Sequence, residues 1–545
     1  MLPNRKISTI LKYGAVLVSI FILLLRISNY TLAFVQLIEL GAVFLLTQLI
    51  FRYNSKLAII TNDILILLIE IQILVYFFTN TYLSMMMLAN IKLYKDLGDS
   101  LPLYAVAGLV VLFVSLLPIE DISSCRPIRK KSNKIISITL LSFIILLSAS
   151  SSFLDINSPM FAYGKLGIEY SKIKKAERQL AKPSSANKEA FFNSQVDDAV
   201  ASKMGSAPNV VLIFTEGFSR RAIDDEKNIT PNISAWEKKT VSFKNYYNHT
   251  AATYRGLIGQ LYSGEQFSNL DSNSLISLND IMRKNGYYTT FINTEPGNKE
   301  WSPWLPNLDF DKIIEREDLR QKKLHWITDN NAYDLLKEEI KGWKDDSPQM
   351  VSIYTFGTHV GLDSPDAVYG NGKNPVLNKF YNLDNEFSKF MDWFETSKET
   401  DNTVLIFTAD HCAYGNTQFI ETFDLGKDTP AWVDEIPLMI YYKGIEPRVI
   451  DANGRNSLDL APTIIDCLDL ENNSENYFLG KTLFMDQGET AYNTTFYGGK
   501  DIPEIVSTAN GKIKYLKDKE YENSMKKMLK YLSVSKTKSM KQDHL

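Results

Sequence analysis

The chain has 545 residues, and its 59 Lys and Arg against 63 Asp and Glu give a net charge of −4, which suits neither a nucleic-acid-binding protein nor a polyanionic tail. That average hides two unlike parts. Residues 1–154 hold 13 basic and 7 acidic residues, a net +6, whereas residues 155–545 hold 46 and 56, a net −10. The strongly apolar front part excludes a single soluble globule, and a total of three cysteines excludes a disulfide-stapled secreted module.

Five apolar stretches follow one another in the front part, and each is close to the ~20 residues that a helix needs to cross ~30 Å of hydrocarbon. They lie at about residues 10–28, 31–51, 57–79, 102–119 and 135–154. The first stretch lacks a small-residue cleavage site behind it, so we interpret it as an anchor and not as a removed signal peptide. The sequence therefore predicts a transmembrane domain of five helices over residues 1–154.

Basic residues between these stretches predict the orientation. They precede the first stretch, lie between the second and third, and lie between the fourth and fifth. They are Arg5, Lys6 and Lys12, then Arg52 and Lys56, then Arg126, Arg129, Lys130, Lys131 and Lys134. If all five stretches cross, every cluster is on one side, which places the N-terminus in the cytoplasm and residues 155–545 outside.

Four ionisable side chains lie inside the apolar stretches, namely Arg26, Glu39, Asp63 and Glu70. Charges in lipid are costly, so such residues mark either a transport path or pairing between helices, and Arg26 and Asp63 lie close enough to a helix end to reach the interface. Both interpretations stay open at the level of sequence.

The remainder of the chain predicts a linker followed by an α/β domain. Residues 155–207 are polar and include the charged helical run SKIKKAERQLAK, which indicates a linker with a helix. In residues 208–545, short apolar runs alternate with amphipathic stretches such as NKFYNLDNEFSKFMDWFE. The runs are VVLIFTE, YYTTFIN, MVSIYTF, TVLIFTAD and PLMIYYKG. This alternation is typical of a mostly parallel sheet covered by helices on both faces.

Three of the apolar runs end on residues that can bind a metal. Glu216, the pair Asp410–His411, and His359 each follow a predicted strand. In open α/β sheets, sites form at the carboxyl ends of the strands, and two carboxylates with an imidazole suit one Zn²⁺ or Mn²⁺ ion. A single acid at a strand end is more often a helix N-cap than a ligand. The coincidence of three such ends in a chain with five histidines favours a site.

A nucleophile for the same site is offered by the segment FKNYYNHTAATYRGLIGQLYSG, where Thr250 and Thr253 precede a predicted helix. A hydroxyl at a helix N-terminus that also coordinates a metal has a lowered pKa and faces an anion-friendly dipole, which suits attack on a phosphate ester. The simpler interpretation of either threonine is an N-cap.

Taken in order, these motifs resemble the sulfatase and alkaline-phosphatase-like superfamily, and more narrowly its membrane-bound branch of lipoteichoic acid synthases and phosphoethanolamine transferases. The resemblance covers about residues 205–490, and the predicted membrane front with an outer catalytic domain is also the architecture of that branch. The motifs are Asn209–Glu216, TPNISAW, SFKNYYNHTAAT, GTH, NTVLIFTADH, IPLMIYYKG and LDLAPTIIDCLDL.

The resemblance implies roles for individual residues. Glu216 matches the first metal ligand, and Asp410 and His411 match two later ligands. Thr253 matches the threonine nucleophile, which also belongs to the ligand set of one divalent cation, Mn²⁺ or Zn²⁺. His359 matches a histidine that contacts the transferred phosphate group or protonates the leaving oxygen.

The sequence also departs from relatives of this kind. The run Thr253-Tyr254-Arg255 lacks the proline of the C/S-x-P-x-R motif of soluble sulfatases, which disfavours sulfate-ester hydrolysis. Arg255 is expected to contact substrate. The Trp-x-Arg grouping of lipoteichoic acid synthases is not reproduced, so Trp301 and Trp304 either line an acceptor site or pack the domain.

The expected protein is therefore a multi-pass enzyme of a bacterial cell membrane with its catalytic domain outside. It would transfer phosphoethanolamine or phosphoglycerol from a membrane phospholipid, through a phosphothreonine intermediate, to an envelope glycan or glycolipid. Two other interpretations stay open: a membrane-anchored phosphodiesterase or sulfatase that passes the intermediate to water, and a non-enzymatic envelope scaffold. Cys412 and Cys467 in the outer domain are expected to be buried thiols.

Overall fold

A computed structural model describes the following residues: 5–79, 81–83, 101–121, 129–153, 158–167, 207–265, 275–299, 301–320, 325–343, 347–425, 430–470, 477–485, 492–497 and 504–542. The chain divides into two compact units, Met1–Lys172 and Ile173–Leu545. The two units are described separately below. Most of the predicted linker, residues 168–206, lies outside the described residues.

The N-terminal unit contains three helices that are long and apolar enough to cross a membrane. These are α1 (Arg5–Ile27), α2 (Tyr30–Phe51) and α3 (Ser55–Thr79). Two further helices, α5 (Leu101–Ser115) and α6 (Arg129–Phe153), have apolar parts of 14 and 15 residues, Pro102–Ser115 and Ser137–Ser151. The first three predicted spans are therefore confirmed as candidate membrane helices, and the count of five stays a prediction.

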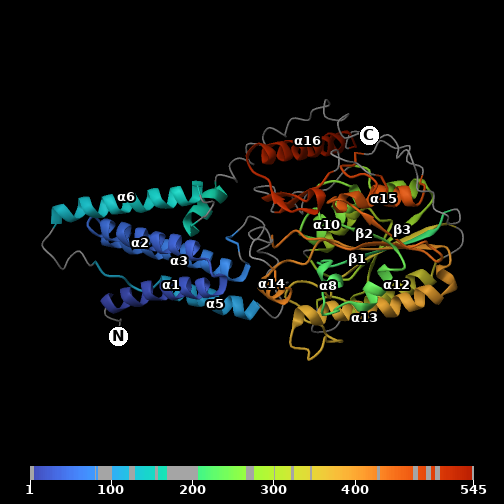
Figure 1. Ribbon diagram of the computed structural model, residues 1–545, viewed down its shortest axis with the longest axis horizontal. Helices are drawn as coiled ribbons and strands as arrows, with labels where there is room; N and C mark the ends of the chain where they lie inside the picture. The colour runs from blue at the N-terminus through green and yellow to red at the C-terminus, as the bar shows by residue number, and fades with distance from the viewer. Residues whose placement is uncertain are drawn as a thin grey trace. The chain divides into compact units, whose positions relative to one another are not determined.

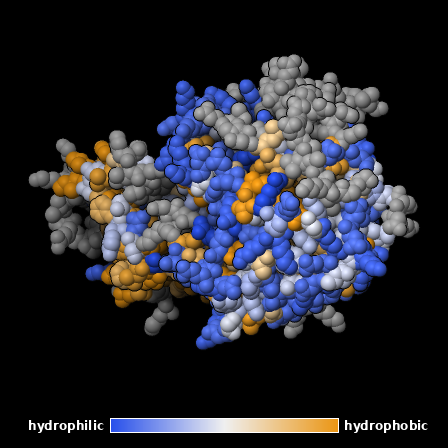
Figure 2. Space-filling view, turned by 45° about the vertical axis from the view of Figure 1, so that its right-hand side comes forward, coloured by the Kyte–Doolittle hydropathy of each residue, from blue (hydrophilic) through white to orange (hydrophobic). Residues whose placement is uncertain are grey.

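Hydrophobic side chains cover much of the outside of these helices, whereas the surface of the C-terminal unit is largely hydrophilic (Figure 2). Inside the helix bundle, three of the four ionisable residues named above have contacts that place them, whereas the Oε1 atom of Glu70 is buried with no hydrogen-bond partner among the described residues. The Lys12 ammonium lies 2.5 Å from the Asp63 carboxylate, and Glu39 accepts hydrogen bonds from the Ser158 hydroxyl and the Met160 amide. Arg26 lies over the ring of Phe77. Contacts within the bundle thus account for Arg26, Glu39 and Asp63 without a transport path.

An eight-stranded sheet forms the centre of the second unit, in the order β4-β3-β5-β1-β6-β7-β2-β8. The strands are β1 (Asn209–Thr215), β2 (Val241–Lys244), β3 (Tyr288–Asn293), β4 (Lys312–Glu315), β5 (Gln349–Thr355), β6 (Thr403–Ala409), β7 (Leu438–Tyr441) and β8 (Arg448–Asp451). All pairings are parallel except those that β7 makes with β6 and β2. The predicted mostly parallel sheet is confirmed.

Helices cover both faces of this sheet. On one face lie α12 (Asp329–Lys341) and α13 (Pro375–Thr396), and on the other lie α10 (Thr253–Tyr262) and α15 (Leu460–Cys467) (Figure 1). The remaining described helices of this unit are α8 (Arg221–Asp224), α9 (Pro231–Glu237), α11 (Leu278–Lys284), α14 (Thr417–Thr422) and α16 (Asp518–Gln542).

A second sheet of three antiparallel strands was not anticipated. Its strands are β9 (Thr494–Tyr497), β10 (Glu504–Ser507) and β11 (Lys514–Tyr515). They have two to four residues each, as do β2, β4 and β8 of the main sheet, whereas β1, β5 and β6 have seven. Runs this short carry too little alternation to be distinguished from loops, and among the four-residue strands of the main sheet only β7, in the apolar run PLMIYYKG, was predicted.

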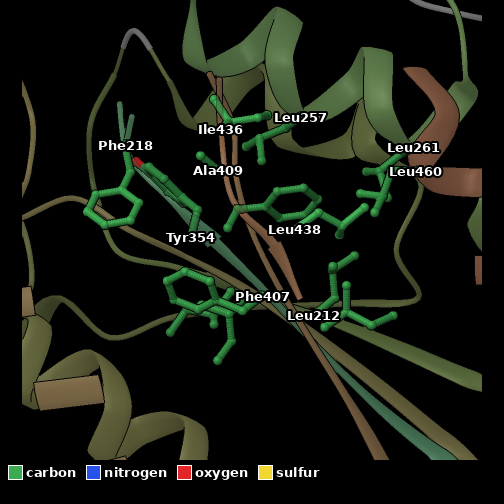
Figure 3. Packing of buried hydrophobic residues seen from close by; sticks show 14 of the residues in the cluster. Leu212, Phe218, Leu257, Leu261, Tyr354, Phe407, Ala409, Ile436, Leu438 and Leu460 are labelled. Atoms are coloured by element: carbon green, nitrogen blue, oxygen red, sulfur yellow. The ribbon is translucent and has the colours of Figure 1, made fainter. Parts of the chain in front are cut away.

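The core lies between the central strands and the helices on either face. In β1 the residues from Val210 to Thr215 are buried, as expected for a strand covered on both faces. Leu257 and Leu261 of α10 pack in the same cluster as Leu438 of β7 and Leu460 of α15 (Figure 3). This packing fixes α10 against the sheet, so the first residue of α10 is held at a defined place near the carboxyl ends of β1 and β6.

Candidate metal centre

Three predicted ligands meet where β1 and β6 end. The two strands run parallel with Thr215 opposite Ala409, so the next residues, Glu216 and Asp410, leave the sheet side by side. The His411 Nε2 atom lies 3.4 Å from Glu216 Oε1 and 3.4 Å from Asp410 Oδ2. One ligand atom from each of the three residues lies within 4.8 Å of the others, and all three residues are buried.

Hydrogen bonds orient two of these side chains toward each other. The Nδ1 atom of His411 lies 2.7 Å from the Cys412 carbonyl oxygen, which only accepts, so Nδ1 carries a proton and Nε2 faces the carboxylates. The Asp410 Oδ1 atom accepts from the amides of Gly217 and His411, at 2.9 and 2.6 Å. Its second oxygen, Oδ2, is buried with no hydrogen-bond partner. That oxygen is directed at the space between the three side chains.

The charges at this point are not balanced by the protein. Burial alone would raise the pKa of Glu216, but the His411 imidazole outweighs burial and lowers that pKa to about 2. Burial and the negative charge of Glu216 raise the pKa of Asp410 well above its usual range. Burial would lower the pKa of His411, yet the charges of Asp410 and Glu216 raise it to about 9. The centre therefore retains a proton at neutral pH where a cation would otherwise lie.

These residues fit a divalent cation. Two carboxylate oxygens and one imidazole nitrogen are the ligand types that Zn²⁺ and Mn²⁺ accept, and ligand distances of about 2.0–2.2 Å fit within the observed separation of the three atoms. The unpaired Asp410 Oδ2 would gain a partner. The structure thus assembles Glu216, Asp410 and His411 into a candidate metal centre; the identity of the metal is not determined by this ligand set.

The hydroxyl group of Thr253 reaches the candidate metal centre. Its Oγ1 donates to Glu216 Oε2 at 2.9 Å, and the residue is half-buried. Thr253 is also the first residue of α10, which begins without a side-chain cap, so the first-turn amides face the same region. Thr250, three residues upstream, is buried, and its carbonyl accepts from Asn248.

Helix α10 is locked to the end of β6 by close backbone contacts. The side-chain amide of Gln260 donates from Nε2 to the backbone carbonyl oxygens of Ala409 and Asp410, at 3.0 and 3.2 Å. A Cβ atom on Gly256 would lie 2.3 Å from the Asp410 carbonyl oxygen, so this position of the helix accommodates no side chain. The glycine therefore allows the approach that brings Thr253 to Glu216, and neither contact was foreseen from sequence.

His359 lies on a loop that follows β5 and is fixed on several sides. Its ring stacks on Phe356 with a centroid distance of 4.7 Å, and its Nδ1 lies 2.9 Å from the Val360 carbonyl oxygen. Nδ1 therefore carries the proton of the neutral ring, and Nε2 is the nitrogen that can accept one. Upstream in the loop, the Thr358 hydroxyl donates to the Glu216 carbonyl, and Asp329 accepts from the Gly357 amide at 3.1 Å.

Lys379 of α13 also belongs to this region and was not predicted. Its Nζ donates to the His359 carbonyl oxygen at 3.0 Å, and the residue is 6 % exposed. Burial lowers the pKa of Lys379 to about 8, against the opposing effects of Glu216 and Asp363. A signal was present in the sequence, because Lys379 lies three residues after Val376 and four before Leu383, on the apolar face of an amphipathic helix.

The three residues expected to contact substrate have structural partners. Arg255 is buried, and burial lowers its pKa to about 10 while the nearby Glu265 acts in the opposite direction. Trp301 is 5 % exposed, and its Nε1 donates to Asn293 Oδ1 at 2.9 Å. Trp304 is partly buried against the same core. Both tryptophan rings contact Tyr254, the neighbour of Thr253, so their packing is linked to the position of the predicted nucleophile.

Comparison with known proteins agrees with this geometry. The family model described as Sulfatase matches residues 208–470, a segment that includes Glu216, Thr253, His359, Asp410 and His411. Comparison with curated proteins gives no match.

Solved structures with the same fold include membrane enzymes. The lipooligosaccharide phosphoethanolamine transferase EptA, an integral membrane protein from Neisseria meningitidis, is 14% identical with a TM-score of 0.51, over 86% of this chain and 95% of that chain. The lipoteichoic acid synthase LtaP from Listeria monocytogenes is 15% identical with a TM-score of 0.50, over 67% and 97%. A protein of the alkaline phosphatase superfamily from Vibrio parahaemolyticus is 17% identical with a TM-score of 0.52, over 68% and 96%. At these identities the comparisons establish the fold.

Proposed function

Because residues 208–470 match the Sulfatase family model in a chain that also carries apolar helices, we propose that this protein is a membrane-bound, metal-dependent head-group transferase. It would move phosphoethanolamine or phosphoglycerol from a membrane phospholipid to an envelope glycan or glycolipid. The observation that carries the proposal is the Thr253 hydroxyl, 2.9 Å from a carboxylate of a three-residue candidate metal centre. The resemblance in fold to EptA, which is named a phosphoethanolamine transferase, and to LtaP, which is named a lipoteichoic acid synthase, supports it.

Each residue of the centre has a role in this proposal. Glu216, Asp410 and His411 would hold one Mn²⁺ or Zn²⁺ ion, with the Thr253 oxygen in reach of the same position. The cation would supply positive charge to phosphoryl oxygens and lower the pKa of the threonine hydroxyl. The first-turn amides of α10, which no side chain caps, favour an anion beside Thr253.

The reaction proceeds in two displacements. In the first, Thr253 Oγ1 loses its proton and bonds to the lipid phosphorus, while the bond from phosphorus to the diacylglycerol oxygen breaks and that oxygen leaves with the electron pair and gains a proton. In the second, an acceptor hydroxyl loses its proton as its oxygen bonds to phosphorus, the bond to Thr253 breaks, and the threonine oxygen leaves with the electron pair and regains a proton. The Nε2 atom of His359 would take up the proton released in each step and return it to the leaving oxygen of that step.

The apolar helices would hold the enzyme at the membrane that contains its lipid substrate. Donor and diacylglycerol both stay in the bilayer, so an enzyme domain attached to membrane helices meets them at a high effective concentration. We propose that all five apolar stretches cross a bacterial cell membrane, with the N-terminus in the cytoplasm and the domain outside.

A hydrolase is the second candidate, because the matching family model is described as Sulfatase. Such an enzyme would use the same centre and pass the intermediate to water. The threonine in place of the Cys or Ser of the soluble sulfatase motif, and the missing proline after it, favour the transferase.

The full-length protein, purified in detergent, tests the proposal with labelled phosphatidylethanolamine or phosphatidylglycerol and Mn²⁺ or Zn²⁺. We expect release of diacylglycerol and added mass on the peptide that contains Thr253. Thr253→Ala should abolish both, whereas Thr396→Ala, an exposed threonine of α13, should change neither. Absence of diacylglycerol with either lipid, or full turnover by Thr253→Ala, would contradict the mechanism. Head-group release to water that an added glycolipid acceptor does not divert would indicate the hydrolase.

A further inference from the structure

The ammonium group of Lys379 is buried beside the candidate metal centre without a carboxylate partner. Its one hydrogen bond goes to a neutral acceptor, the carbonyl oxygen of His359 at 3.0 Å, and the residue is 6 % exposed. Among the described residues, no carboxylate oxygen lies within 4.0 Å of its Nζ atom. An ammonium has three protons to donate, so this arrangement leaves hydrogen-bonding capacity within a nearly closed environment.

Three other buried cations of the protein each have a carboxylate partner. Arg220 and Arg455 are 4 and 5 % exposed, and they hold Glu237 and Asp459 at 2.5 and 2.7 Å. Lys12 in the helix bundle is fully buried and holds Asp63 at 2.5 Å. A buried cation without an anion is costly, which is why these three are paired. Lys379 departs from that pattern, and it does so next to a site that would receive an anionic substrate.

The position of Lys379 within the fold places it opposite the nucleophile. Lys379 belongs to α13 on one face of the sheet, whereas Thr253 belongs to α10 on the other face (Figure 1). Both side chains are linked to Glu216 by hydrogen bonds: Thr253 donates to the Glu216 carboxylate, and Lys379 donates to the carbonyl of His359, whose neighbour Thr358 donates to the Glu216 carbonyl oxygen. Residues from both faces thus approach the end of β1 together.

A charge count identifies what is missing from this site. The two carboxylates of Glu216 and Asp410 balance one divalent cation, and His411 is neutral when it binds a metal. A phosphodiester adds one negative charge, which would remain unbalanced in a buried site. The positive charge of Lys379 balances it, and its unused donors match the non-bridging oxygens of a phosphate.

We propose that Lys379 is a cationic residue of this site that binds a non-bridging oxygen of the transferred phosphate group. The inference deepens the proposed function and rests on it for the class of substrate. Lys379 would hold the phosphate from the side of α13 while Thr253 attacks from the side of α10. The hydrogen bond to the His359 carbonyl orients the ammonium in the absence of the anion.

Binding of inorganic phosphate to the Mn²⁺-loaded full-length protein tests this role by calorimetry, without turnover. Lys379→Met should weaken phosphate binding by about 10- to 100-fold, the worth of one hydrogen bond to a charged group, and leave Mn²⁺ affinity within about threefold. The matched control is Lys389→Met, on the same helix, where the lysine is 63 % exposed and pairs with Glu386. This variant should bind phosphate as the unchanged protein does.

Two further variants separate charge from packing, should Lys379→Met fold poorly. Lys379→Arg keeps the positive charge, and Lys379→Gln keeps a donor for the His359 carbonyl but is neutral. Phosphate affinity should follow charge, with Arg close to Lys and Gln close to Met. Equal phosphate affinity in the Arg and Gln variants, or unchanged affinity in a folded Met variant, overturns the proposal. If the unchanged protein releases no diacylglycerol while Lys379→Met still loses phosphate, the proposed function fails and the role of Lys379 stands.

Discussion

Two regions of this protein, the helix bundle and the ends of β1 and β6, differ in how neighbouring buried charges are arranged. In the helix bundle, the Lys12 ammonium lies 2.5 Å from the Asp63 carboxylate, and Glu39 accepts from a hydroxyl and an amide. At the ends of β1 and β6, by contrast, two carboxylates, Glu216 and Asp410, lie close together around one imidazole. A buried charge beside a charge of opposite sign can be part of a stable fold. Two like charges that lie close together are unfavourable unless a bound ligand of opposite charge neutralises them, so such a cluster indicates a binding site.

The largest effect is expected from removing a carboxylate of the candidate metal centre. Glu216→Gln should lower metal affinity by about 100-fold or more and turnover by about 1000-fold, because a ligand and the acceptor of the Thr253 hydrogen bond are both lost. Metal content of the purified protein and diacylglycerol release measure the two quantities.

The control for that change is another buried carboxylate of the same domain. Asp384 is fully buried and accepts from the amides of Asn232 and Ile233, at 3.2 and 2.7 Å. Asp384→Asn should lower thermal stability and leave the metal content unchanged. Equal metal content in the Glu216 and Asp384 variants would refute the assignment of the centre.

In the helix bundle, breaking a pair should cost stability and not catalysis. Lys12→Met leaves Asp63 without its partner, and removal of one member of a buried pair costs about 3–5 kcal/mol. Unfolding in mixed detergent micelles measures the loss. Lys56→Met, on an exposed position of α3, is the matched control and should have little effect. The double variant Lys12→Met/Asp63→Leu should recover much of the stability; if it does not, the pair is not the source of the loss.

Two glycine substitutions compare a closely packed position in α10 with an open position in α5. Gly256→Ala would place a methyl group 2.3 Å from the Asp410 carbonyl oxygen, so α10 must shift away from β6 and carry Thr253 with it. We expect a loss of about 1–3 kcal/mol in stability and a fall in turnover. Gly108→Ala in α5 has open space around the new methyl and should be neutral. Full activity of Gly256→Ala would show that the position of α10 is not critical.

The smallest effect concerns the pH dependence of metal binding. The pKa of His411 in the metal-free protein is raised to about 9, above its ordinary value, so below pH 9 a cation must displace a proton from Nε2. Metal affinity should therefore rise about tenfold for each pH unit between about pH 6 and 8.5. Competition with a chromophoric chelator measures this slope. An affinity that does not change across that range would mean that cation binding releases no proton from His411 and that His411 does not bind the cation.

Much of the second unit could be predicted because its central strands are long and buried on both faces. The runs that became β1, β5 and β6 are mostly apolar, and Glu216, His359 and Asp410 follow within one to four residues of their ends. Parallel strands in register bring such ends together, so Glu216, Asp410 and His359 could be grouped before any coordinates were known. The short edge strands and the three-stranded sheet carried no comparable signal.

The sequence did not predict the residues that hold the centre in place. Gly256 and Gln260 act through backbone atoms of β6, and Asp329 acts through the amide of Gly357. Such contacts depend on how close two elements approach, which no spacing within one element encodes. Cys412 and Cys467 were predicted as buried thiols, and both are free and buried, as confirmed here for the described residues.

By itself, the sequence determined the class of the protein: an apolar front part, a mostly parallel sheet, and ligand-type residues at the ends of its strands. Only the tertiary structure decided the partners of those residues. It placed the Thr253 hydroxyl against Glu216 because α10 packs through a glycine, and it brought Lys379 of the opposite face to the carbonyl of His359. The physical reason is that hydrophobic periodicity can be recognised within a single helix or strand. The balance of charge at a site depends instead on side chains that come from several helices and strands.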